Sequence, residues 1–99
     1  MTSRYYYLDG HQPIPCTLME WGERFNDATR IVAQEHIGDI FVSTVFLGLD
    51  HALFDDDGPL LFETMIFGGP HDLYQDRYAT WDEAVTGHEK ACAIVRGAA

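Results

Sequence analysis

Two stretches in the middle of the chain are apolar at almost every position. Residues 40–48 are rich in Phe, Val and Ile, and residues 60–67 are apolar apart from Glu63 and Thr64. Because a strand places alternate side chains on opposite faces of a sheet, both stretches are apolar on both faces. They therefore predict two central strands that are covered on both sides.

Two weaker segments extend the predicted β structure. Residues 5–8 are aromatic and strand-like, and the Asp9-Gly10 pair ends them in a turn. The prolines that follow keep the next stretch extended and non-helical. Residues 30–37 form a further candidate strand, and a tight turn at Gly38-Asp39 connects it to the central pair.

Two capping boxes mark the predicted helices. Thr17 and Glu20 begin a short amphipathic helix that we expect to run to about Asn26. Thr80 and Glu83 begin a longer helix in the same way. Its apolar stripe at helical period consists of Trp81, Ala84, Val85, His88, Cys92 and Val95.

These elements predict a single α+β domain over residues 1–99, in the order β-α-β-β-β-α. The expected architecture is a four-stranded, mainly antiparallel sheet with two helices, which can cover one face. The central strands then leave apolar surface on the other face. Either a protein partner or a second copy covers this surface, or the N-terminal segment and long loops fold over it.

Composition and charge exclude several classes of protein. The chain has 46% hydrophobic residues and thirteen aromatic ones, which excludes a disordered chain. Its net charge of −10 argues against a protein that binds nucleic acid through phosphates, and against binding to an anionic membrane. The α-β-β-β-α portion has the element order of a double-stranded-RNA-binding domain. We reject that analogy because Asp82 and Glu83 occupy the turn that would need cations.

The chain shows no signal for export or membrane insertion. No apolar leader follows Met1, and no apolar run approaches the roughly 20 residues that span a bilayer. Cys16 and Cys92 fit no metal or redox spacing, so they are interpreted as buried thiols, with a disulfide as the alternative. We expect a location in the cytoplasm.

Three ionisable residues are candidates for acid–base chemistry. His51 ends the first central strand, Glu63 lies within the second, and His88 lies in the helical stripe. A buried carboxylate needs a partner, so we expect Glu63 to pair with His88 or with His51. Such a pair could act as a general acid and base, form half of a metal site, or simply fix the packing register.

Other motifs carry weaker chemical signals. The Asp55-Asp56-Asp57-Gly58 run does not fit a calcium loop, because Leu53 and Thr64 stand where ligands are required. It is interpreted as a solvated acidic turn. The aromatic residues are expected in the core or in an interface rather than on a base-stacking surface. The predicted binding residues are Asp50, Asp55, Asp56, Asp57, Tyr78 and Trp81. No metal site and no cofactor are predicted.

Three blocks of the chain resemble a known family. Residues 42–51 are similar to a Val-Ser-Thr-Val-Phe-Leu-Gly-x-Asp-His signature of small uncharacterised proteins from tailed phages and prophages. Residues 61–69 and 77–88 look like the second and third blocks of that family, and residues 7–16 fit its start. The loop at residues 52–59 departs from the pattern. The resemblance implies a phage or prophage origin and expression in a bacterial cytoplasm. The residues that the blocks share are Asp50, His51, Glu63, Tyr78, Trp81 and His88.

Three functions are consistent with these features. The first, which we prefer, is a non-enzymatic, acidic accessory protein that binds a basic protein partner and inhibits it. The second is a small enzyme or a ligand- or metal-binding protein that uses His51, Glu63 and His88. The third is a structural homo-oligomer, for which a dimer packed sheet on sheet is expected.

The negative charge is concentrated in one half of the sequence. Between Glu35 and Glu89 there are twelve acidic residues and a single base, Arg77, whereas the rest of the chain is almost neutral. We therefore expect a localised acidic surface, and such a surface favours a basic partner.

Overall fold

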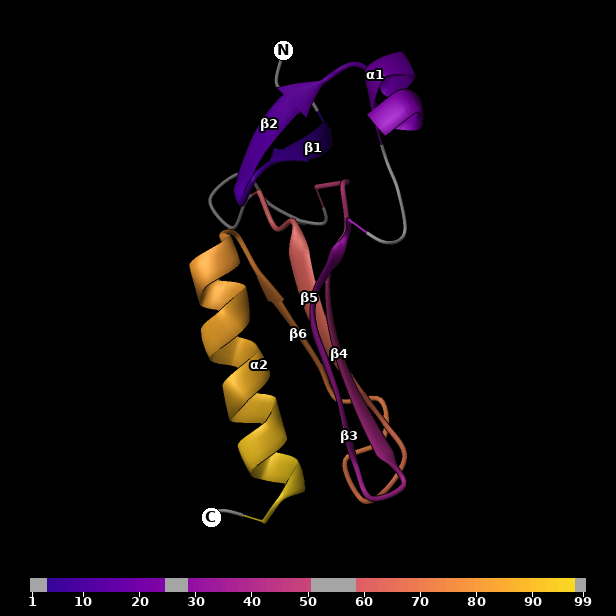
Figure 1. Cartoon of the computed structure of the whole chain (residues 1–99), viewed down its shortest axis with the longest axis vertical. Helices are drawn as coiled ribbons and strands as arrows, with labels where there is room; N and C mark the ends of the chain where they lie inside the picture. Colours follow the sequence, from indigo (N-terminus) through magenta and orange to yellow (C-terminus); the bar gives the residue numbers. More distant parts are fainter. Residues whose placement is uncertain (1–3, 25–28, 51–58, 98–99) are drawn as a thin grey trace.

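The computed structural model describes residues 4–24, 29–50 and 59–97. Within these residues, the fold consists of two sheets and two helices (Figure 1). Strands β1 (Tyr5–Asp9) and β2 (Gln12–Cys16) form an antiparallel hairpin, and helix α1 (Leu18–Arg24) follows it. The larger sheet is an antiparallel meander in the order β3-β4-β5-β6. Its strands are β3 (Ile31–Ile37), β4 (Ile40–Phe46), β5 (Phe62–Phe67) and β6 (Gln75–Tyr78), and α2 (Trp81–Val95) follows them.

The predicted α+β class, with a four-stranded antiparallel sheet and two helices, is confirmed. The structure adds two strands to the predicted order, and β1 pairs with the first of them instead of joining the larger sheet. In β2, Pro13 and Pro15 stand at alternate positions, so their nitrogens face the same edge. A hairpin strand tolerates proline there because no second neighbour needs the missing N–H groups. Strand β6 is too polar to be recognised by its pattern, and it forms by pairing with β5.

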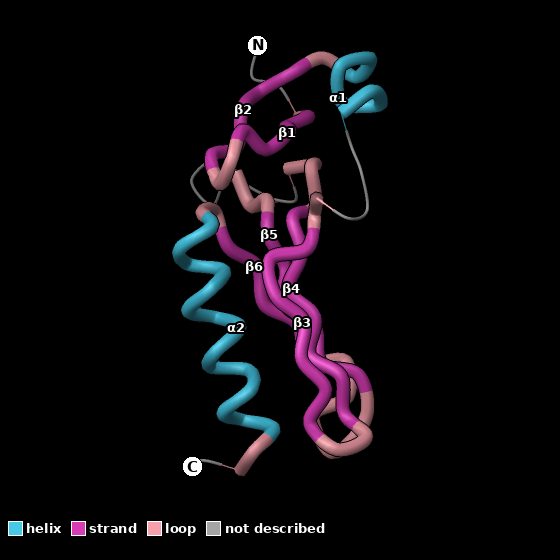
Figure 2. Tube along the Cα trace, viewed as in Figure 1, coloured by secondary structure: helices cyan, strands magenta, loops and turns pink. Residues whose placement is uncertain are grey.

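Helix α2 covers one face of the larger sheet and contacts all four of its strands (Figure 2). Small residues allow this close approach, since Ala84, Gly87 and Ala91 are buried in the interface. A Cβ atom on Gly87 would lie 2.1 Å from the Tyr78 hydroxyl oxygen, so a larger residue there would have to displace the Tyr78 ring. The apolar stripe expected from the sequence is wrong at one position. Val85 is 36% exposed, whereas Gly87, which was not in the stripe, is buried against the sheet.

The core under α2 consists of two apolar clusters. One lies near the start of the helix and contains Tyr6, Phe46, Leu61, Phe62 and Ala84. The other lies near its end and contains Val42, Ile66, Ala91 and Cys92. The N-terminal hairpin therefore contributes to the first cluster through Tyr6. Its backbone N–H also donates to the Gly48 carbonyl at 2.9 Å, which attaches the hairpin to the end of the larger sheet.

The two faces of the larger sheet differ in what covers them. The hairpin and α1 lie at one end of the sheet rather than across the face opposite α2, and α1 contacts β1 (Figure 1). Residues 51–58, the other segment expected to cover this face, lie outside the described residues. We call the face opposite α2 the distal face.

Candidate functional site

A buried polar layer separates the two apolar clusters under α2. Thr44 and Thr64 face each other across β4 and β5, and their hydroxyl oxygens lie 2.6 Å apart. The Thr44 hydroxyl also lies 2.7 Å from Nδ1 of His88 on the helix. Both threonines are fully buried and His88 is 7% exposed. The layer satisfies three polar side chains within an apolar core, and it fixes how the helix and the two strands align.

His88 continues this layer towards the end of α2. Its Nε2 lies 3.6 Å from the sulfur of Cys92, one helical turn further on. Burial lowers the pKa of His88, against an opposing effect of nearby Glu89, and burial also raises the pKa of the Cys92 thiol. A neutral imidazole and a protonated thiol are therefore the favoured forms in the folded chain. Neither cysteine forms a disulfide and both are buried, as the preferred interpretation of the sequence predicts.

Glu35 on β3 lies at the open side of the same group. Its register partner is Val42, whose side chain is buried beneath α2, so Glu35 is on the helix-covered face. A carboxylate oxygen of Glu35 lies within 4.8 Å of a ligand atom on His88 and on Cys92. Arg96, which is the C-cap residue of α2, forms an ion pair with Oε2 of Glu35.

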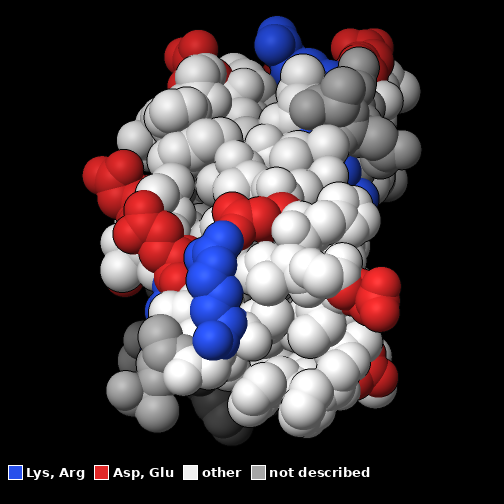
Figure 3. Space-filling view, turned by 60° about the horizontal axis from the view of Figure 1, so that its bottom comes forward, with Lys and Arg blue, Asp and Glu red and all other residues white. Residues whose placement is uncertain are grey.

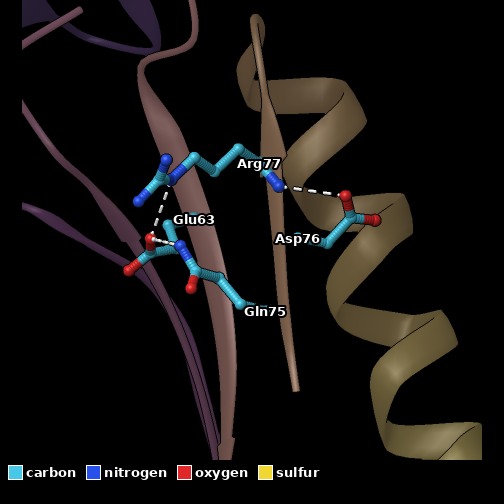
Figure 4. A network of polar contacts seen from close by, with 4 residues as sticks. All are labelled: Glu63, Gln75, Asp76 and Arg77. Atoms are coloured by element: carbon cyan, nitrogen blue, oxygen red, sulfur yellow. Dashed lines mark hydrogen bonds and ion pairs between the residues drawn. The ribbon is translucent and has the colours of Figure 1, made fainter. Parts of the chain in front are cut away.

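The predicted pairing of Glu63 with His88 is wrong. Glu63 precedes Thr64, which points towards α2, so strand alternation places Glu63 on the distal face. Its carboxylate accepts hydrogen bonds from Arg77 Nε at 3.0 Å and from Gln75 Nε2 at 2.7 Å (Figure 4). The half-buried carboxylate has the partner that its burial requires, but a base on the neighbouring strand provides it.

The remaining predicted site residues are dispersed. Asp50 accepts a hydrogen bond from the Leu60 backbone N–H at 3.0 Å, which closes the base of the intervening loop. The ring of Tyr78 packs on Gly87, and Trp81 packs edge-on against Phe62. His51, Asp55, Asp56 and Asp57 lie outside the described residues. The described members of the set therefore have packing or loop-closing contacts and do not converge on one site.

A cavity of about 560 Å³ opens between the hairpin and the start of α2. Its lining includes Asp9, His11 and Asp82, and the His11 ring stacks on Trp81 with centroids 3.8 Å apart. The Thr80–Glu83 capping box satisfies the backbone N–H groups of Thr80 and Glu83 at this end of the helix. The cavity therefore offers an imidazole and carboxylates to a ligand.

The distal face carries apolar side chains together with polar pairs. The ring of Phe67 is 41% exposed and lies 6.2 Å from that of Phe41, which in turn contacts His36. Ile31 is 40% exposed, and its register partner Val45 belongs to the same face. Strand alternation places Met65 between these groups. The apolar residues on both faces of β4 and β5 predicted an apolar surface on this side of the sheet. The polar pairs on the same face include residues of β3 and β6, and pairing between the strands places them there.

Acidic side chains have local roles in much of the described chain. Carboxylates that accept hydrogen bonds include Glu20, Glu35, Asp50, Glu63, Asp72, Asp76 and Glu83. On the face drawn in Figure 3, some acidic groups adjoin one another and a basic side chain, and others are separated from them by uncharged surface. The acidic side chains of that face therefore do not form a single patch.

Comparison of the chain with models of protein families, with curated proteins and with solved structures finds no match. The resemblance to tailed-phage proteins stays a prediction. Among the described residues, no helix is long and apolar enough to cross a membrane.

Proposed function

We propose that this chain is a small protein-interaction module and that the distal face of its larger sheet is the binding surface. The observation that carries the proposal is the exposure of Phe67 beside Phe41, and of Ile31 beside Val45, on the face opposite the one covered by α2. Large apolar side chains exposed on one face together with polar pairs are typical of protein interfaces. With the phage resemblance, this supports an accessory protein that inhibits a basic host factor in a bacterial cytoplasm.

The proposed partner is a different, basic protein rather than a second copy. Two copies would bring together two chains of net charge −10, and this repulsion opposes self-association. The negative field of the chain instead attracts a basic partner, steers its approach and raises the association rate. The Glu63–Arg77 pair within the face is neutral, so the attraction comes from the net negative charge of the chain as a whole.

The test compares two single variants of the full chain. Phe67→Ser removes an exposed aromatic ring of the distal face, whereas Val85→Ser changes an exposed apolar residue on α2. Proteins captured from host lysate are identified, purified and measured for association rate at several salt concentrations. We expect a basic partner whose association rate falls roughly tenfold or more from low to high salt. Phe67→Ser should weaken its binding and Val85→Ser should not.

Two outcomes contradict the proposal. One is that the purified partner binds the Phe67→Ser variant as tightly as the unchanged chain. The other is that light scattering over a range of concentrations shows a stable dimer that Phe67→Ser dissociates, because the face would then belong to a second copy.

A further inference from the structure

We propose that Glu35, His88 and Cys92 bind a divalent transition-metal ion, with Zn²⁺ as the natural occupant. One carboxylate oxygen, one imidazole nitrogen and one sulfur lie within 4.8 Å of one another, and His88 and Cys92 are buried. The inference is independent of the proposed function, because these side chains lie on the face of the sheet that α2 covers. The residues differ from the His51–Glu63–His88 set expected from the sequence.

The spacing of the two buried ligands matches tetrahedral coordination. With a Zn–S bond of about 2.3 Å and a Zn–N bond of about 2.0–2.1 Å, a tetrahedral angle places sulfur and nitrogen about 3.5 Å apart. The observed distance between Cys92 Sγ and His88 Nε2 is 3.6 Å. An ion could therefore enter between these atoms with little movement of α2.

Thr44 orients the imidazole for this role. Its hydroxyl contacts Nδ1 of His88. A metal bound at Nε2 requires the Nδ1–H tautomer, in which Nδ1 donates to the Thr44 hydroxyl and the Nε2 lone pair is directed towards the sulfur. Metal-binding histidines usually have such a partner on the second ring nitrogen. Thr64 holds the Thr44 hydroxyl in turn. The buried polar layer thus acts as the support of the proposed site.

The donor set selects the kind of metal. Thiolate and imidazole suit Zn²⁺ and its neighbours in the transition series, whereas Mg²⁺ and Ca²⁺ prefer oxygen ligands. On binding, the Cys92 S–H bond breaks, the proton passes to solvent and the thiolate donates an electron pair to the metal. The Glu35 side chain is 39% exposed, so the fourth coordination position opens towards water on that side. Arg96 bonds to Oε2 and leaves the second oxygen of Glu35 for the metal.

Cobalt provides a direct test, because a thiolate bound to Co²⁺ gives a charge-transfer absorption band. The full chain is freed of metal with a chelator, titrated with Co²⁺ and then with Zn²⁺. We expect the thiolate–cobalt band together with the visible bands of tetrahedral Co²⁺, and we expect Zn²⁺ to abolish both. Cys92→Ala should lack the charge-transfer band. Cys16→Ala, which removes the other buried thiol, should retain it.

Glu35→Gln makes the test independent of whether Cys92→Ala folds, because Glu35 is partly exposed. Loss of even an indirect metal partner costs about 10–100-fold in affinity, so we expect at least a tenfold loss for this variant. The proposal is overturned if the unchanged chain gives no thiolate–cobalt band. It is equally overturned if the band persists in Cys92→Ala, or if Glu35→Gln binds Co²⁺ as tightly as the unchanged chain.

Discussion

The Thr44 hydroxyl connects two elements because it contacts Thr64 on the next strand and His88 on the helix. Thr44→Val keeps the shape of the side chain and removes the hydroxyl. It should lower the free energy of unfolding by about 1–3 kcal/mol, since buried polar atoms lose a partner. Ser43→Ala, one position away on the distal face, should change it by less than about 0.5 kcal/mol. Urea denaturation measures both, and equal effects would contradict a structural role for the buried layer.

His88 should make the stability of the metal-free chain depend on pH. Burial lowers its pKa below the ordinary value of 6.5, so the unfolded chain takes up a proton more readily than the folded one. The contribution of neutral His88 to the free energy of unfolding is therefore fully present above about pH 6.5. It is lost as the pH falls from there towards the lower pKa of the folded state. Because one proton is taken up, the free energy of unfolding cannot change by more than about 1.4 kcal/mol per pH unit through His88.

The comparison that isolates this effect is His88→Gln. Urea denaturation at several pH values should show that the difference in unfolding free energy between the unchanged chain and the variant decreases below pH 6.5. If that difference stays constant or increases, His88 is not the residue that takes up the proton.

At the scale of elements, the two capping boxes have the same chemistry but different consequences. Each threonine accepts a hydrogen bond from a glutamate backbone N–H at 3.1 Å, at Thr17 in α1 and at Thr80 in α2. Helix α1 buries no residue, whereas α2 covers the larger sheet. A cap therefore matters to global stability in proportion to the packing of its helix.

Thr80→Ala should consequently lower the free energy of unfolding by about 1 kcal/mol. Thr17→Ala should leave the free energy of global unfolding nearly unchanged, because α1 buries no residue and can fray without exposing the core. Urea denaturation followed by near-ultraviolet circular dichroism reports the global transition. An equal loss in both variants would show that α1 contributes to the cooperative core.

Local patterns allowed the strongest elements to be predicted. The apolar runs identified β4 and β5, and the capping boxes identified both helix starts. The pattern missed β2 and β6 because pairing with a neighbour, rather than composition, makes them strands. The strand predicted to reach Gly48 ends at Phe46, and Gly48 itself has a positive φ that a continuing strand does not adopt.

The candidate site was less predictable because it depends on register. The sequence indicated that Glu63 needs a partner, yet a shift of one residue along a strand decides which face it occupies. The same uncertainty concealed Glu35, whose neighbours are set by pairing with Val42. The four-residue spacing of His88 and Cys92 was visible in the sequence and indicated a shared helix face.

At the scale of the whole molecule, the larger sheet has two distinct faces. One buries two apolar clusters and a polar layer beneath α2, and the other presents exposed aromatic and aliphatic side chains. Sheets that bury one face commonly carry polar residues on the other. The apolar content of the distal face is therefore the feature of this molecule that most favours an interaction with a partner.

The most direct measurement places a photo-activated cross-linker at Met65 on the distal face, and separately at Val85 on the outer surface of α2, in cells that naturally produce the chain. We expect that the cross-linker at Met65 attaches to a basic protein of different sequence, and that the cross-linker at Val85 does not. Cross-linking from Val85 alone, or to the same protein equally from both positions, would contradict the assignment of the distal face as the binding surface.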